Sequence, residues 1–336
     1  MKVKSELSEA APILPSLDRP IRFLMLLAGF ISGAGVYEIK SIHLQRFCSI
    51  RHLITCAVLL SFLLSTLILT WDKEKDKDIE VLLVKIATLF WMTYTAVNPC
   101  VVFAACHGKW GLEKYYEALC DVEQRLGVLG AKISYKKISA IIYTVTAFFI
   151  LAGMGMGSSR VVYHVSGNPF FFFGILNENA TTPVGIQIFN IYQTAGEIFL
   201  NFIWTITVAY YICVCGISWV LIQDYNTCLE KAISEKPEKV MENIAIYRIA
   251  HLRLTGLVAQ ANKVFSAMLG LILVANVAIV LFMLYILSFP DLERPADYIT
   301  WVTLASVTTI LFVIPSDRVA ASVSIFSKSL LSFHKE

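Results

Sequence analysis

The chain has 336 residues, of which 57% are hydrophobic and only 16% are charged. A soluble domain does not need so large a share of apolar residues, so the composition indicates a membrane protein. The 28 basic and 25 acidic side chains leave a net charge of +3, which gives no ground for a nucleic-acid partner.

The chain begins with a polar segment, residues 1–18, which is predicted to be a disordered tail. The next apolar run, residues 21–37, is shorter than the roughly twenty residues that comfortably span a bilayer, and its glycines weaken it as a helix. We predict that it lies at the membrane interface or re-enters the membrane, with a full span as the alternative. Residues 19–336 are then expected to form a single transmembrane domain.

Six later segments are apolar and long enough to cross the bilayer as helices. The second of them contains Lys85 near its start and is interrupted by Pro99. The fold class predicted is therefore an all-α, polytopic helical bundle in the cell membrane. The six segments cover residues 53–71, 81–105, 138–158, 187–219, 264–288 and 299–315.

The charges between the spans predict the orientation, because basic residues close to helix ends are retained in the cytoplasm. Lysine and arginine concentrate before the first span, between the second and third, and between the fourth and fifth. The other connections are acidic or nearly neutral, and one of them carries the N-glycosylation sequon Asn179-Ala180-Thr181. We therefore expect a cytoplasmic N-terminus and a glycan on Asn179.

The fourth span carries polar side chains at steps of three and four residues, which places them in one stripe of a helix. A carboxylate in the hydrocarbon region costs about 3 kcal/mol even on lenient insertion scales, so Glu197 needs a partner, a proton or a water-filled cavity. The stripe either lines a ligand cavity or ion path, or forms a polar seam that joins helices. Its members are Gln187, Asn190, Thr194, Glu197 and Asn201.

Lys85 is the other charge within a predicted span. Lys85 and Glu197 lie at comparable depths from the outer ends of their helices, so an ion pair between them is one expectation, because a lone buried charge is costlier. The alternative is that the Lys85 side chain extends to the outer interface.

We expect a small-molecule pocket in the outer half of the bundle, since such pockets combine apolar walls with a few orienting polar groups. An interface anchor is the alternative role for Trp301, because aromatic residues gather at the ends of membrane helices. The candidate ligand-binding residues are Tyr192, Gln193, Glu197 and Trp204 on the fourth span and Trp301 on the sixth.

Apolar residues at helical spacing continue outside the fifth and sixth spans, on the side expected to be cytoplasmic. A helix with one apolar face must bury it, so these extensions predict a cytoplasmic bundle, within one subunit or between subunits. A helix on the membrane surface is the alternative. The first stripe is Tyr247, Ala250, Leu254, Leu257, Ala261 and Val264, and the second is Val319, Val323, Phe326, Leu330 and Phe333.

The sequence contains no phosphate loop, no metalloprotease motif and no nucleophile elbow. Its six histidines are scattered, and its eight cysteines lack the spacing of a zinc or haem site. We therefore predict that the protein is not an enzyme and that it uses no metal and no cofactor.

The segment from Ile246 to Ser266, with Asn262 and Phe265 as its most specific residues, resembles the corresponding part of invertebrate gustatory receptors. The run from Ile314 to Ser322 and the order of spans and basic loops fit the same family, which belongs to the insect-type chemoreceptors. The resemblance implies a seven-helix subunit that assembles with itself or with related subunits as a tetrameric cation channel gated by small-molecule tastants. It also implies an outer ligand pocket and an anchor of cytoplasmic helix extensions.

One feature departs from this family. Its seventh helix lines the pore, whereas this sequence ends at Glu336 before any such segment. Either the last segment is missing from this chain or the receptor is a shortened form, and we expect a subunit that does not conduct ions alone. A G-protein-coupled receptor with seven helices is an alternative if residues 21–37 span the membrane, although Cys106-His107-Gly108 stands where an acidic-Arg-Tyr triplet is expected. A transporter or an accessory membrane protein is the other alternative.

Overall fold

The computed structural model describes residues 13–17, 20, 50, 54–58, 60–61, 64, 79–107, 112–165, 183–289 and 295–333. All regular elements among these residues are helices, which confirms the predicted all-α class for this part of the chain. The helices are α1 (Leu14–Leu17), α4 (Ile79–His107), α5 (Leu112–Val128), α6 (Tyr135–Val165), α7 (Pro183–Glu235), α8 (Pro237–Glu242), α9 (Ile244–Ile286) and α10 (Pro295–Phe333).

Several sequence predictions fall outside the described residues. They concern residues 1–12 of the tail, the apolar run 21–37, most of the first predicted span and the sequon at Asn179. Within the predicted disordered tail, Leu14–Leu17 form the short helix α1, and the Leu14 side chain is fully buried. This part of the tail is therefore ordered against the rest of the chain.

Four stretches of the described helices are long and apolar enough to cross a membrane. They overlap the third to sixth predicted spans, and α4 contains the second predicted span within one helix of 29 residues. The structure therefore supports a multi-pass membrane protein, while the total of six spans stays a prediction. The four stretches are Tyr135–Gly155, Ile198–Glu235, Ile244–Ile286 and Tyr298–Val323.

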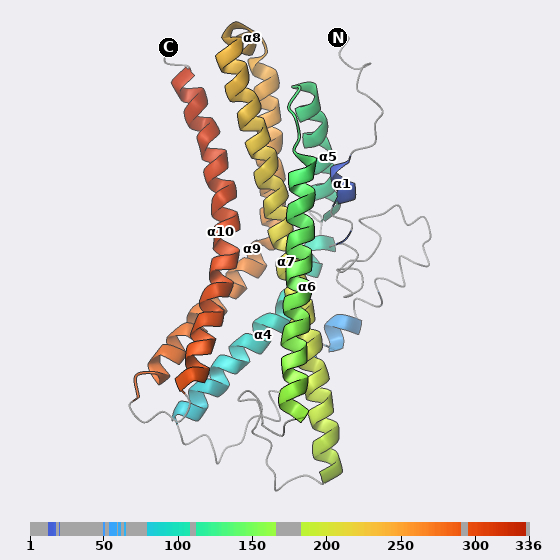
Figure 1. Ribbon diagram of the computed structural model, residues 1–336, viewed down its shortest axis with the longest axis vertical. Coiled ribbons are helices and arrows are strands. Elements are labelled where there is room, and N and C mark those ends of the chain that lie inside the picture. Colours follow the sequence, from blue (N-terminus) through green and yellow to red (C-terminus); the bar gives the residue numbers. More distant parts are fainter. Residues whose placement is uncertain are drawn as a thin grey trace.

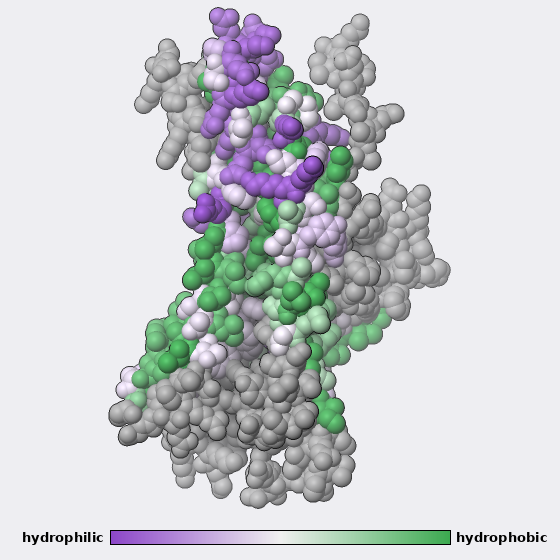
Figure 2. All heavy atoms as spheres, in the orientation of Figure 1, coloured by the Kyte–Doolittle hydropathy of each residue, from purple (hydrophilic) through white to green (hydrophobic). Residues whose placement is uncertain are grey.

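The long helices extend well beyond a bilayer. The 43 residues of α9 make a rod of about 65 Å, whereas the hydrocarbon core of a bilayer is about 30 Å thick. The comparably long α7 and α10 both pack against α9 (Figure 1). Figure 2 shows hydrophilic side chains gathered at the end of the molecule that holds α8, with hydrophobic ones along the middle. The predicted helix extensions are therefore present, and the side of the membrane on which they lie stays a prediction.

The turn at this polar end is set by a proline. The residue before a proline is held away from the helical conformation, and Lys236 accordingly has φ −150° and ψ 67°, which ends α7 at Glu235. Pro237 then opens α8 at a position where a helix needs no N–H from it. After α8 the chain turns back through Asn243 into α9.

Helix α5 was not predicted, since the sequence indicated only a basic connection between the second and third spans. Its apolar side chains recur at helical spacing and are buried: Tyr115, Leu119, Val122 and Leu126. Because α5 packs on α9, the first apolar stripe is covered within the subunit. This agrees with the predicted bundle within one subunit. Tyr247, Ala250, Leu254, Leu257 and Val264 of that stripe are buried, and Ala261 is half-buried.

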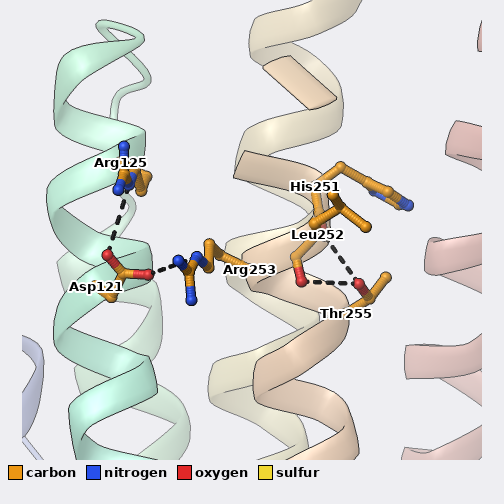
Figure 3. A network of polar contacts seen from close by, with 6 residues as sticks. All are labelled: Asp121, Arg125, His251, Leu252, Arg253 and Thr255. Atoms are coloured by element: carbon orange, nitrogen blue, oxygen red, sulfur yellow. Dashed lines mark hydrogen bonds and ion pairs between the residues drawn. The ribbon is translucent and has the colours of Figure 1, made fainter. Parts of the chain in front are cut away.

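An ion pair joins α5 to α9 at the surface of this bundle (Figure 3). The Arg253 guanidinium lies 3.1 Å from one carboxylate oxygen of Asp121, and Arg125 lies 3.5 Å from the other. These side chains are partly solvated, and such exposed pairs contribute at most about 1 kcal/mol. The apolar face of α5, and not this pair, therefore holds the two helices together.

The second stripe is described only in part. Val319 is buried and Val323 is half-buried, whereas the side chains of Phe326, Leu330 and Phe333 lie outside the part of the chain that the structure describes. Burial of the end of α10 by the same subunit, by another subunit or by the membrane surface therefore stays a prediction.

Candidate functional site

Four aromatic side chains meet inside the bundle, where α4, α7 and α10 come together. The Trp91 ring lies between the other three, with centroid distances of 5.2 Å to Tyr94, 5.7 Å to Trp204 and 5.4 Å to Trp301. All four side chains are buried. Rings at such distances attract one another beyond the effect of area burial alone. We refer to Trp91, Tyr94, Trp204 and Trp301 as the aromatic cluster.

The α4 residues of this region share one face of their helix. Trp91, Tyr94 and Asn98 follow one another at steps of three and four residues, which is the spacing of a single helical face. That face turns into the protein, since Tyr94 is 2% and Asn98 only 1% exposed. Asn98 therefore lies one turn beyond the aromatic cluster, in the interior of the bundle.

Three buried side chains of this region have polar atoms without a hydrogen-bond partner among the described residues. They are the indole Nε1 of Trp204, the hydroxyl of Tyr94, and both the nitrogen and the oxygen of the Asn98 amide. A buried polar group left unpaired costs about 1–3 kcal/mol, and the great majority of such groups in native proteins are paired. These atoms are therefore free to bind a ligand or water.

Two threonines of α7 close to Trp204 do not need an external partner. Thr205 and Thr207 each donate to the backbone carbonyl four residues earlier in their own helix. Asn201, from the predicted polar stripe, is also buried, so this part of the stripe faces the protein interior. Unpaired buried polar atoms also occur elsewhere in the described bundle, on Thr146, Asn226 and Gln260, so Trp204 and Asn98 are distinguished by their place at or next to the aromatic cluster.

The structure brings together two of the five predicted ligand-binding residues. Trp204 and Trp301 both contact Trp91, and Trp301 is only 5% exposed, so its ring lies inside the bundle. Tyr192 is 44% exposed and lies about 18 Å from Trp204 along α7, so it does not join the aromatic cluster.

The side chains of Gln193, Glu197 and Lys85 lie outside the part of the chain that the structure describes. Their roles in ligand binding therefore stay predictions, as does the ion pair between Lys85 and Glu197.

A groove of about 350 Å³ opens between α7, α9 and α10. Asn262 and Phe265, the most specific residues of the resemblance described above, line it together with Tyr211. The Tyr211 ring centroid lies 5.3 Å from that of Phe265, and its hydroxyl donates to the Phe312 carbonyl over 3.1 Å. Most of the other residues around the groove are apolar, so the groove suits an apolar occupant.

No family model and no curated protein matches this sequence. Its structure, however, is similar to a solved one, the insect olfactory receptor OR5 from Machilis hrabei, with a TM-score of 0.64. The likeness covers 92% of this chain and 81% of that chain at 11% sequence identity. The chain has the fold of an insect olfactory receptor.

This fold agrees with the resemblance to insect-type chemoreceptors seen in the sequence. An identity of 11% shows the fold alone, so the receptor fold carries no information on the ligand or on the gustatory type. Within this receptor fold, the aromatic cluster joins three helices that are far apart in the sequence. The aromatic cluster with Asn98 is the candidate ligand site.

Proposed function

We propose that the chain is a subunit of an insect-type chemoreceptor, of the gustatory kind, that binds a small organic molecule at the aromatic cluster. It works as a component of a ligand-gated, non-selective cation channel in the cell membrane, in a tetramer with itself or with related subunits. The receptor fold and the resemblance of the segment Ile246 to Ser266 support this proposal. They also favour it over a G-protein-coupled receptor or a transporter.

The observation that carries the ligand site is the unpaired indole nitrogen of Trp204 within aromatic walls. An indole N–H only donates, whereas the Asn98 amide both donates and accepts. A ligand with an apolar or aromatic body and an acceptor oxygen, such as a carbonyl, ether or hydroxyl, would satisfy the indole. A second polar group on the ligand would reach Asn98.

The proposal is tested by ligand-evoked cation current in a heterologous cell, with the chain expressed alone and together with related receptor subunits. Once a panel of small organic compounds yields an agonist, Trp204→Phe removes the N–H while it keeps an aromatic ring. Loss of a hydrogen bond worth about 1.4 kcal/mol predicts a roughly tenfold higher half-maximal agonist concentration. Tyr143→Phe, which removes a hydroxyl from an exposed aromatic ring outside the aromatic cluster, is the control.

Equal agonist sensitivity in the wild type and in Trp204→Phe would show that the ligand does not use this donor. A panel that evokes no current in any subunit combination, in cells that carry the chain on their surface, would count against the channel role itself.

A further inference from the structure

A second cleft, of about 400 Å³, lies between α6, α7 and α10. Its walls are mainly apolar and include Ile141, Ile212 and Pro315, while Trp219 and Arg318 also line it. Gly216 permits the close approach of α6 and α7 here, because a Cβ at this position would lie 2.8 Å from Ile141 Cγ2.

One cation lines this cleft, and a second lies on the ring of one of its wall residues. Arg318 is one of its lining residues, and the Lys137 ammonium lies 4.5 Å from the centroid of the Trp219 ring. The same ammonium donates to Gln223 Oε1 over 2.9 Å. Trp219 therefore lies next to both cations. It lines the cleft together with Arg318, and its ring contacts the Lys137 ammonium.

Neither cation is paired with a carboxylate among the described residues. The acidic side chain closest in sequence to Gln223 is Asp224, and both of its oxygens accept hydrogen bonds from Ser134, at 2.7 Å from the backbone N–H and 2.9 Å from the hydroxyl. Lys137 and Arg318 are exposed. Among the described residues, Lys137 and Arg318 thus have no carboxylate within salt-bridge distance, and Asp317, the acidic neighbour of Arg318 in the sequence, is exposed to solvent.

The positions of Lys137 and Arg318 along their helices determine which part of a membrane lipid they can contact. Lys137 lies at the start of the apolar stretch Tyr135–Gly155, and Arg318 lies near the end of the stretch Tyr298–Val323. Tryptophan with an adjacent cation is typical of the level where a membrane helix leaves the hydrocarbon region. The cleft therefore opens at lipid headgroup depth, with its apolar part directed along the helices.

We propose that this cleft binds one anionic phospholipid. Lys137 and Arg318 hold the headgroup phosphate through charge-assisted hydrogen bonds, which are stronger than neutral ones. An acyl chain lies in the apolar cleft against Ile141 and Ile212. If the basic loops are cytoplasmic, as the sequence predicts, the lipid belongs to the cytoplasmic leaflet, which is rich in anionic lipids such as phosphatidylserine.

Native mass spectrometry of the purified chain in detergent tests this, with phosphatidylserine and phosphatidylcholine of identical acyl chains added in turn. The wild type is expected to hold one phosphatidylserine in preference to phosphatidylcholine. Each neutralised cation weakens anionic lipid binding about fivefold, so Lys137→Gln with Arg318→Gln should lower the affinity at least tenfold. Lys132→Gln with Lys136→Gln is the matched control, because it removes the same charge from exposed lysines outside the cleft.

The charge-conserving pair Lys137→Arg and Arg318→Lys should retain phosphatidylserine, which separates loss of charge from loss of folding. Equal retention by wild type and the neutral double variant, or equal loss in the lysine control, would overturn the proposal. Glycerophosphoserine, which has the headgroup without acyl chains, should displace little lipid. Full displacement at equal concentration would show that the site binds a free phosphate headgroup and not a lipid.

Discussion

The attachment of α1 to the rest of the chain depends on one buried carboxylate. Glu123 of α5 is 8% exposed and accepts hydrogen bonds from the backbone N–H of Ile13 at 3.0 Å and of Leu14 at 3.1 Å. The Tyr135 hydroxyl is its third donor, at 2.8 Å. The two backbone donors bond to different oxygens, so the carboxylate uses both of its oxygens on this segment.

The substitution Glu123→Gln replaces one of these acceptor oxygens by an NH2 group. Whichever way the amide turns, the backbone N–H of either Ile13 or Leu14 then faces another donor. Loss of one hydrogen bond to a charged group, with the N–H left unpaired, costs about 2–3 kcal/mol. Opening of the segment Leu14–Leu17 should therefore become roughly 30- to 150-fold more frequent.

Hydrogen exchange followed by mass spectrometry on the peptide that covers residues 13–17 measures this opening. Glu117→Gln serves as the control, since Glu117 is an exposed residue of the same helix. Tyr135→Phe should have a smaller effect, because it removes the third hydrogen bond and leaves the backbone donors paired. Unchanged protection in Glu123→Gln, or equal acceleration in Glu117→Gln, would refute the assigned role of the carboxylate.

Three further outcomes are expected. If Lys85 and Glu197 form an ion pair, Lys85→Met with Glu197→Gln should express better than the worse single variant, as measured by surface labelling. Asn179→Gln should remove a glycan and increase gel mobility, while an N-terminal epitope should stay unlabelled on intact cells, since labelling there would contradict the six-span topology. Burial raises the pKa of the Cys120 thiol, with Glu123 adding to the effect, so alkylation at pH 8 should be several-fold slower in the native than in the unfolded chain by peptide mapping.

The membrane helices were predictable because bilayer thickness sets the length of an apolar span. The same rule does not predict where a helix ends in water. The predicted fourth span accordingly ended at Trp219, whereas α7 continues to Glu235. A signal was present, since Ile222, Tyr225 and Leu229 continue the helical spacing and are buried. Helix α5 has the same helical spacing of buried apolar residues. Its segment is also rich in charged residues, so its average hydropathy is low and does not reveal the helix.

The candidate site was predictable only in part, for a different reason. Trp204 and Trp301 were selected as aromatic residues of outer helix halves, but that criterion does not say which helices are neighbours. Trp91 brings them together, because α4 packs on both α7 and α9 and so carries its inward face to the aromatic cluster. In a count of hydrophobic residues Trp91 and Tyr94 are not distinguished from aliphatic residues, and Asn98 counts as an interruption. The spacing of three and four residues marks all three as one face, and the receptor fold turns that face inward, so periodicity within an apolar span is the signal that identifies such a site.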